Sequence, residues 1–429
     1  MKALIKGMAK ERGEVNIHGA KNSILPLVCS SILFNKSSFE NVPDIVDLQY
    51  LLKILEADLS ITSSKYDGIL RIDCSKNVSK SAVLSHKHIG SIRYSTLLMG
   101  ALLGSGVDNV SIPISGGCSS FGDRPIDIHL SGFESLGYSV ETTNTFIKIE
   151  RTNLVDKSVS LNLRFASVGA TINLVMAALG RSGDTVISNI AKEPEVSNLI
   201  AYLSERTNRI SLGNDFVKVY GLSEENIKED LNEVSWPVMP DRIEAVSYII
   251  LGALASGCEI NNISGLDLTG VENVLKAMGI NYNFNKEKLI VNPSKHSLST
   301  IQIKTGIFPN LNTDYQPLVT MALLFANGES TIIDEIYPKR FAYLTELEDH
   351  ISADILKFDA GKVIIKGSDK LTFSGNELYA HDLRAGFCMC LISGLFEQDV
   401  AIDNFDQVKR GYSNLVKNFE TFGIKIQEL

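Results

Sequence analysis

The segment at residues 241–257, DRIEAVSYIILGALASG, begins with opposite charges at Asp241 and Arg242 and continues as an almost uninterrupted apolar run. A helix that is apolar on nearly every face is buried on all sides, whereas a surface helix keeps one polar face. The segment therefore predicts a helix inside a core. It also places two ionisable side chains at the N-terminus of that helix.

The same pattern recurs through the chain at a period of about 70 residues, which is typical of an internal repeat. Each copy opens with a polar turn and continues into an Ala-, Leu-, Ile- and Met-rich helix. The six openings are GAKNSILPL (19–27), GSIRYSTLLMGALL (90–103), ASVGATINLVMAAL (166–179), DRIEAVSYIILGALASG (241–257), NTDYQPLVTMALL (312–324) and DLRAGFCMCLISGL (382–395).

Each opening is followed by alternating strands, such as KLIVNP (288–293) and GKVIIKG (361–367), and by a second, amphipathic helix. Alternating strands bury one face and expose the other. Buried helices surrounded by half-exposed sheets predict an α/β class. The expected architecture is two inside-out α/β domains, each of three repeated units with buried helices and outer sheets.

A chain of 429 residues exceeds what one core usually supports. Two prolines in WPVMPDRIEA (236–245) mark the expected crossover and hinge between the halves. We therefore expect one domain at 20–238, which carries the cysteine loop described below. The second domain is expected to combine 1–19 with 239–429.

Composition narrows the class of protein. The net charge of −9 argues against a nucleic-acid or membrane-surface partner held by bulk attraction. No signal-peptide core and no membrane-spanning run is present. The six cysteines contain no CxxC pair, and the histidines show no metal spacing. The expected protein is cytoplasmic, with reduced thiols, no metal, no cofactor and no obligatory protein partner.

The unit openings carry polar groups that folding alone does not require. They are Lys21, Asn22, Arg93, Ser167, Gly169, Asp241, Arg242, Asp314, Asp382 and Arg384, with Arg340 and Arg410 just ahead of second helices. Helix N-termini favour anions, and arginine suits phosphate and carboxylate. If the buried helices start at one level, these groups line a cleft between the domains. We expect that cleft to bind a multiply anionic small molecule.

One loop, SGGCSSFGDRPIDIH (115–129), combines a thiol with a nearby guanidinium. Its glycines and polar residues leave little to bury, so a structural role for Cys118 fits poorly. A thiol beside an arginine has a tendency toward thiolate.

The chain resembles the UDP-N-acetylglucosamine enolpyruvyltransferase (MurA-type) family of the EPSP synthase superfamily over nearly its whole length. The motifs that carry the resemblance are GAKNSILPL, SIRYS, SGGCSSFGDRPIDIHLSGFESLG, ASVGAT, AKEPEV, PDRIEA, NTDYQPL, KRF, DLRA and RGY, in that order. The resemblance implies an inverse α/β barrel fold. It also implies transfer of enolpyruvyl from phosphoenolpyruvate to the 3′-hydroxyl of UDP-N-acetylglucosamine, the step that commits carbon to peptidoglycan.

Residue roles follow from the same resemblance. Cys118 matches the acid that protonates phosphoenolpyruvate, so an epoxide that alkylates it is expected to inhibit. Asp314 matches the proposed base for the 3′-hydroxyl. The residues matched to phosphoenolpyruvate are Lys21, Arg124 and Arg410, with Arg93, Arg340 and Arg384 as the surrounding basic set. Asn22 matches the polar neighbour of the lysine, and Ile336 is a further expected substrate-binding residue. The residues matched to the uridine and diphosphate are Arg124, Pro125, Ile126, Asp127, Ile128, Arg164, Ser167, Val168 and Gly169.

Two alternatives stay open. The loop between Cys118 and Arg124 is one residue longer than the family spacing, and NLNTDYQPL (310–318) lacks a usual proline and glutamine. The longer loop can change the position of the thiol. Several departures from the family pattern lie near the acceptor side of the expected cleft, and they leave room for a paralogue that uses another UDP-sugar or nucleoside phosphate. A ring-shaped interaction scaffold of six α/β units is the other reading, but it needs neither the thiol nor the arginines.

Overall fold

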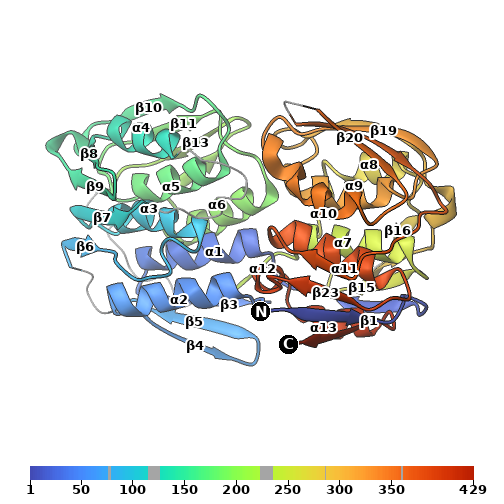
Figure 1. The fold of residues 1–429 in the computed structure, drawn as a ribbon. Helices are drawn as coiled ribbons and strands as arrows, with labels where there is room; N and C mark the ends of the chain where they lie inside the picture. Colours follow the sequence, from blue (N-terminus) through green and yellow to red (C-terminus); the bar gives the residue numbers. More distant parts are fainter. Residues whose placement is uncertain (76–78, 115–125, 223–234, 286, 359–360) are drawn as a thin grey trace.

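A computed structural model describes residues 1–75, 79–114, 126–222, 235–285, 287–358 and 361–429. The chain forms two halves that lie side by side, each with helices inside and sheets outside (Figure 1). The inside-out α/β architecture expected from the repeat is confirmed.

The first helix of each unit lies in the middle of its half, and its residues are almost all buried. These helices are α1 (Lys21–Ser30), α3 (Leu97–Gly104), α5 (Val168–Ala178), α7 (Arg242–Leu254), α9 (Gln316–Leu323) and α11 (Leu383–Gly394). Their apolar side chains point in every direction, so only a site enclosed on all sides removes them from water.

Six four-stranded sheets enclose these helices, and all six share one topology. In each, the first strand runs parallel to the second, and the remaining pairs are antiparallel. The sheets of the first half contain β14 (Ser235–Pro237), β3 (Lys36–Glu40), β5 (Ile69–Asp73) and β4 (Thr62–Tyr66); β6 (Ser81–Val83), β7 (Asn109–Pro113), β9 (Phe146–Arg151) and β8 (Tyr138–Thr142); and β10 (Val159–Asn162), β11 (Thr185–Ser188), β13 (Phe216–Val219) and β12 (Ile210–Leu212).

The sheets of the second half follow the same rule. They contain β2 (Gly13–Asn16), β15 (Cys258–Asn261), β17 (Lys288–Val291) and β16 (Tyr282–Phe284); β18 (Gln302–Lys304), β19 (Gly328–Ile333), β21 (Lys362–Gly367) and β20 (Asp354–Phe358); and β22 (Glu377–Tyr379), β23 (Val400–Asp403), β1 (Ala3–Lys6) and β24 (Lys425–Glu428). Strand burial alternates, as in β15 and β23, so one face of each sheet packs on the helices.

Outer helices connect the strands. They are α2 (Val46–Leu59), α4 (Asp127–Ser135), α6 (Pro194–Thr207), α8 (Glu272–Ala277), the short α10 (Thr345–Glu348), and α12 (Asp406–Lys409) with α13 (Leu415–Glu420). Short 3₁₀ turns include η2 (Arg93–Thr96), η7 (Thr313–Tyr315) and η8 (Pro338–Leu344).

Two separate clusters of buried apolar side chains form the cores. One runs from Ile24 to Val238, and the other combines Ala3–Ile17 with Ile243–Ile426. The N-terminal strand β1 accordingly pairs with β23 and β24 of the second half (Figure 1). The domain limits at 20–238 and at 1–19 plus 239–429 stay a prediction.

The chain crosses between the halves twice, and the two crossings run side by side. Gly19 and Pro240 form an isolated bridge, and the N–H of Ala20 donates to the carbonyl of Met239 at 2.7 Å. A Cβ at Gly19 would lie 2.1 Å from the carbonyl oxygen of Asn41, so this close approach requires glycine.

The second repeat unit opens with a 3₁₀ turn ahead of its buried helix. Arg93 lies in this polar turn, and the apolar helix of the unit begins at Leu97. The hydroxyls of Ser95 and Thr96 donate to the carbonyls of Ile92 and Arg93, at 2.8 and 2.9 Å. Such local bonds offer the backbone an alternative to the first α-helical turn.

In the described part of the chain, no helix combines the length and the apolar character needed to cross a bilayer.

Helices α3 and α5 pack closely against each other at Gly100 and Asn173, and a substitution at Gly100 tests this contact. A Cβ at Gly100 would lie 2.1 Å from the carbonyl oxygen of Asn173, which is backbone and cannot rotate away. We expect Gly100→Ala to lower the free energy of unfolding by about 2 kcal/mol or more, as overpacked cores do. Gly90→Ala is the matched control, because a Cβ there meets nothing within 4 Å. Denaturant unfolding of both variants checks this, and equal stability would contradict the close packing.

Candidate active site

A carboxylate on α2 holds two of the expected site cations together. Lys21 Nζ lies 2.6 Å from Asp47 Oδ2, and Arg410 Nε donates to Asp47 Oδ1 at 2.8 Å. Burial holds the pKa of Lys21 below its usual value, and the Asp47 charge opposes that shift. Although burial alone raises the pKa of Asp47, Lys21 and Arg410 together keep that pKa below its ordinary value.

Arg384 lies in the same cluster, near the start of α11. The side-chain carboxylate of Asp382 caps this helix by accepting from the N–H groups of Arg384 and Ala385 at 2.7 and 3.2 Å. The guanidinium is 2% exposed and lies 5.1 Å from the ring centre of Tyr412. Among the described residues, its Nε and Nη1 atoms have no hydrogen-bond partner. A buried donor without a partner is costly, so these two groups are suited to an anionic ligand.

Asp314 and Arg340 form the second ion pair of the cluster. Arg340 Nη2 donates to Asp314 Oδ1 at 2.6 Å, and its Nη1 donates to Thr313 Oγ1 at 3.0 Å. Asp314 itself is held by its N–H, which donates to Asn312 Oδ1 at 2.8 Å in the turn before α9. The side chain of Asp314 is 28% exposed, whereas that of Arg340 is 4% exposed. The carboxylate is therefore oriented by its partner and still reaches solvent.

Groups from the first half face this cluster. Tyr94 donates its hydroxyl to Asn22 Oδ1 at 2.8 Å. Burial raises the pKa of Tyr94, and the charges of Glu195 and Asp314 raise it further. The carbonyl of Ser91, just ahead of Arg93, accepts from Arg410 Nη2 of the second half at 3.1 Å, so groups from both halves lie close together. The Nη1 atom of Arg93, next to Tyr94, is buried and lacks a partner within the described ranges.

The segments matched to the sugar nucleotide also meet. Arg164 forms an ion pair with Asp127, at the first turn of α4. Ser167 caps α5 by accepting from the N–H of Ala170 at 3.3 Å, so Val168 and Gly169 begin a helix whose first N–H groups face outward. Ile126 and Ile128 are partly buried and pack against the first core.

The sequence analysis missed His129, which is 3% exposed and lies beside this helix start. Asn173 Nδ2 approaches His129 Nδ1 at 2.9 Å, and Asn173 Oδ1 accepts from the N–H of Gly100 at 2.7 Å. Because Oδ1 accepts, Nδ2 is the amide donor and Nδ1 of the imidazole accepts, which leaves the proton on Nε2. Nε2 lies 3.1 Å from the position of a Cβ at Gly169. Burial, and then the charge of Arg93, lowers the pKa of His129 to about 4, so the ring is neutral.

A second missed feature is a buried ion pair between the halves. Arg242 donates to both carboxylate oxygens of Glu195 at 2.9 and 3.2 Å, and to the hydroxyl of Tyr315 at 3.2 Å. The sequence analysis named Arg242 but gave it no partner. Nothing in the AKEPEV motif marks Glu195 as the partner of Arg242, because only the fold brings these two residues together.

Three of the expected residues, Cys118, Arg124 and Pro125, lie outside the described residues. Ile336 is half-buried, and its N–H donates to Asp334 Oδ1 at 3.1 Å, in the turn before Arg340. The five described cysteines are buried. Burial raises the pKa of Cys74 and of Cys258 to about 12, so neither acts as a thiolate near neutral pH.

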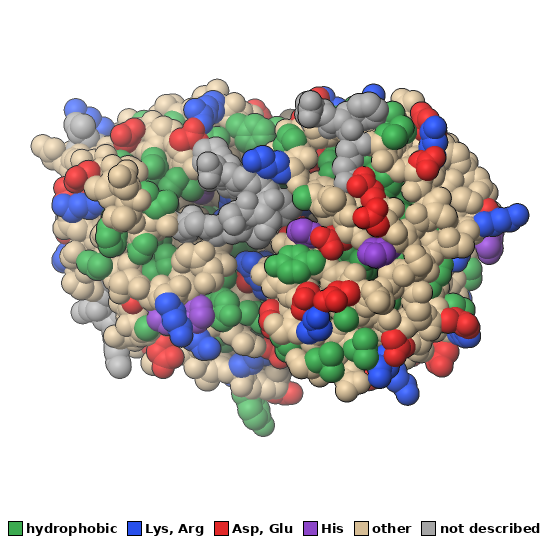
Figure 2. Space-filling model, in the orientation of Figure 1, with side chains coloured by type: hydrophobic (Ala, Val, Ile, Leu, Met, Phe, Trp, Pro, Cys, Tyr) green, Lys and Arg blue, Asp and Glu red, His purple; other side chains and the backbone are tan. Residues whose placement is uncertain are grey.

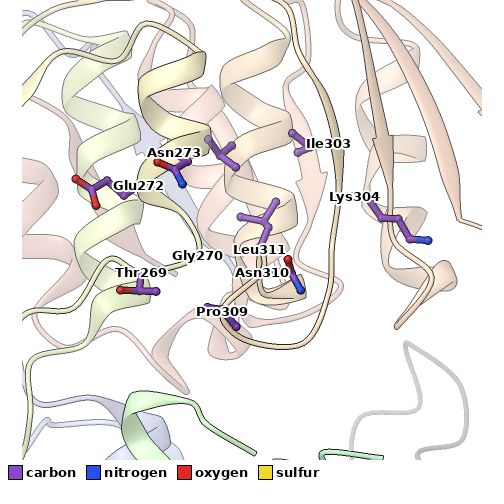
Figure 3. Close-up of a pocket in the computed structure, with 10 residues that line it drawn as sticks. Thr269, Gly270, Glu272, Asn273, Ile303, Lys304, Pro309, Asn310 and Leu311 are labelled. Carbon is purple, nitrogen blue, oxygen red and sulfur yellow. The ribbon is translucent and has the colours of Figure 1, made fainter.

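Two hollows in the described part of the chain lie away from the expected site residues. A hollow of about 430 Å³ lies between α8 and the segment 303–311, lined by Thr269, Asn273 and Asn310 among others (Figure 3). Another of about 650 Å³ lies along the crossover, at Pro237–Pro240. None of the expected site residues lines either hollow. On the face in Figure 2, acidic and basic side chains are interspersed. The described residues contain no group of three or more His, Cys, Asp or Glu that could hold a metal.

Comparisons with known proteins find similarity over nearly the whole chain. The family model for EPSP synthase (3-phosphoshikimate 1-carboxyvinyltransferase) matches residues 5–419. The chain is similar to UDP-N-acetylglucosamine 1-carboxyvinyltransferase 2 of Staphylococcus aureus (strain Mu50 / ATCC 700699), with 36% identity over 427 residues that cover 98% of this chain and 97% of that protein. The protein of the same name from Staphylococcus epidermidis is 35% identical, with the same coverage.

Two solved structures share the fold. The enolpyruvyl transferase NikO from Streptomyces tendae superposes with a TM-score of 0.86 at 20% identity, covering 99% of both chains. An EPSP synthase from Acinetobacter baumannii gives a TM-score of 0.70 at 15% identity, covering both chains completely.

The neutral, buried His129 predicts a loss of stability in acid. The unfolded residue protonates near its ordinary pKa of 6.5, whereas the folded residue protonates near 4. Between these values the unfolded chain binds the extra proton, so the free energy of unfolding falls as the pH drops. From pH 7 to pH 5 we expect His129 to account for a loss of about 2 kcal/mol.

Denaturant unfolding of wild type and His129→Asn at both pH values measures this loss. Asparagine keeps an acceptor for Asn173 but does not titrate, so the variant should lose correspondingly less stability in acid. His296→Asn is the control, because that side chain is 77% exposed. An acid dependence in His129→Asn as steep as in the wild type would contradict a neutral His129.

Proposed function

This chain belongs to the EPSP synthase family and, within it, to the UDP-N-acetylglucosamine 1-carboxyvinyltransferases, and from that membership we propose its reaction. The protein transfers the enolpyruvyl group of phosphoenolpyruvate to the 3′-hydroxyl of UDP-N-acetylglucosamine and releases phosphate. The product is a precursor of peptidoglycan, and both substrates place the enzyme in the cytoplasm.

The observation that carries the proposal is the Arg384 guanidinium. It is 2% exposed, and two of its nitrogens lack a partner among the described residues. Lys21 and Arg410 lie in the same cluster, and their charges, with that of Arg384, act on one another. Phosphoenolpyruvate carries about three negative charges near neutral pH, as the phosphate and carboxylate groups ionise. Such a ligand supplies acceptors to donors that burial keeps from water.

Asp314 is suited to act as the base. Arg340 orients its carboxylate at 2.6 Å, and the side chain still reaches solvent. We assign it the proton of the sugar hydroxyl. The 3′-oxygen then attacks C2 of phosphoenolpyruvate while C3 takes a proton. In the second step C3 loses one proton and C2 loses phosphate, which restores the double bond. The net products are the enolpyruvyl sugar nucleotide and phosphate.

Cys118 is the proposed acid that protonates C3, although it lies outside the described residues. The assignment rests on the family motif SGGCSSFGDRPIDIH at 115–129. The described cysteines support this assignment indirectly. All five are buried, and none of them is among the residues matched to substrate.

The acceptor site is proposed at the start of α5. The segments 126–128 and 164–169 are joined there by the ion pair between Arg164 and Asp127. The N-terminal end of α5 carries N–H groups suited to phosphoryl oxygens. We assign the sugar of the acceptor to Asn22, which accepts from Tyr94 at 2.8 Å, and to Arg93, whose Nη1 lacks a partner among the described residues.

Phosphate release tests the reaction directly. We expect release when protein, phosphoenolpyruvate and UDP-N-acetylglucosamine are mixed, and none when either substrate is left out. Release only with another UDP-sugar or nucleoside phosphate would assign the chain to a paralogue with a different acceptor. No release with any nucleotide acceptor would contradict the proposal and favour an interaction scaffold.

Substitution of the proposed acid gives a second test. Cys118→Asp keeps a group that donates a proton, so we expect it to retain measurable phosphate release. Cys118→Ser should retain very little, since a positioned acid is typically worth about 10² to 10⁴ in rate. Cys258→Ser is the control, because Cys258 is buried in the second core and should not affect the reaction. Equal activity of Cys118→Ser and wild type would exclude Cys118 as the acid.

A further inference from the structure

Asp47 occupies an unusual position in the first turn of α2. Its side chain is 2% exposed, and both of its oxygens are used by cations. Oδ1 accepts from Arg410 Nε at 2.8 Å, while Oδ2 accepts from Arg410 Nη2 at 3.3 Å and lies 2.6 Å from Lys21 Nζ. A bidentate guanidinium contact of this kind fixes direction as well as distance.

Asp47 does not serve as a helix cap. The N-cap of α2 is Ile45, which makes no side-chain capping bond. No backbone N–H group of α2 donates to the Asp47 carboxylate among the hydrogen bonds of the described residues. The carboxylate is therefore committed to the two cations and not to its own helix.

The contact joins the two halves of the molecule. Asp47 and Lys21 belong to the first half, whereas Arg410 follows α12 in the second half. Two further bonds join the same surfaces: the N–H of Asp44 donates to Ser413 Oγ at 2.8 Å, and Arg410 Nη2 donates to the carbonyl of Ser91 at 3.1 Å. Docking of the halves and alignment of the two cations thus depend on one small contact area.

We propose that Asp47 is a positioning residue of the phosphoenolpyruvate site, holding Lys21 and Arg410 side by side and bringing Arg410 across from the second half. The inference rests on the proposed function. Asp47 touches neither substrate in this assignment and acts through the two cations that do.

Charge explains why a carboxylate is needed there. Lys21 is faced by Arg410 and Arg384, both positive, and by Asp47; its N–H donates to Asp241 at 3.3 Å. Burial and the two arginines favour the neutral amine, whereas Asp47 favours the ammonium ion. Without the Asp47 charge, the pKa of Lys21 would be lower still, so the ammonium group would lose its proton at a lower pH than in the wild type. A neutral Lys21 is a poorer ligand for a phosphate or carboxylate.

The test is the pH dependence of phosphoenolpyruvate binding in Asp47→Asn. Asparagine keeps the shape but removes the charge. We expect the KM for phosphoenolpyruvate to rise at least about tenfold at pH 8 and by less at pH 6, because a lower pH favours the ammonium form of Lys21. The KM for UDP-N-acetylglucosamine should stay within about threefold of the wild type at both pH values. Asp47→Glu, which restores the charge, should recover part of the loss.

Asp44→Asn is the matched control, since Asp44 lies in the same segment but its exposed side chain contacts Gln49. It should leave both KM values unchanged. Thermal unfolding of all variants separates a loss of folding from a loss of positioning.

Three results would overturn the role of Asp47: a loss that does not depend on pH, an equal rise in both KM values, or a lower KM for phosphoenolpyruvate. The last would show that Asp47 competes with the substrate. Each can occur while the wild type still releases phosphate, so the proposed function survives it. A wild type that neither binds nor turns over phosphoenolpyruvate would overturn both inferences.

Discussion

Six helices that are apolar on every face impose the main constraint on this molecule. Each must be enclosed, and a single sheet covers only one side of a helix. Three repeated units per half solve this problem, because each unit contributes one buried helix and one outer sheet. The N-termini then lie at the core boundary, where helices such as α7 and α11 are capped by Asp241 and Asp382. The same requirement that builds the core therefore gathers polar groups at the helix starts.

Most of the buried cations near the starts of the core helices are paired with a carboxylate. Asp47 compensates Lys21 and Arg410, Asp314 compensates Arg340, and Glu195 compensates Arg242. Isolated buried charges are expensive, and pairing with hydrogen bonds reduces that cost. Arg384 departs from this rule among the described residues, since two of its nitrogens lack a partner. In the proposed function, these two nitrogens donate to the anionic ligand.

Two of the contacts between the halves are ion pairs. The Arg242–Glu195 pair lies near the crossover, and the Arg410–Asp47 pair lies where α12 of the second half meets α2 of the first. Interfaces of this character resemble those between domains that move relative to one another. Because two cations, Arg242 and Arg410, belong to the second half and their carboxylates to the first, the position of Arg410 in the proposed site depends on how the halves are docked.

Sequence pattern was sufficient for the architecture. Apolar periodicity and repeat length predicted the six units and their buried helices, because both depend on short stretches of chain. The polar opening of the second unit forms a 3₁₀ turn at Arg93, a detail that the pattern alone did not specify. Motifs named the charged residues of the site, including Lys21, Asp314 and Arg384. Their partners were beyond reach: Asp47 lies 363 residues from Arg410, and His129 lies 44 residues from Asn173. Such pairings arise only when packed helices bring distant segments together, so the tertiary structure alone assigned each charge its counterion and the His129 ring its proton.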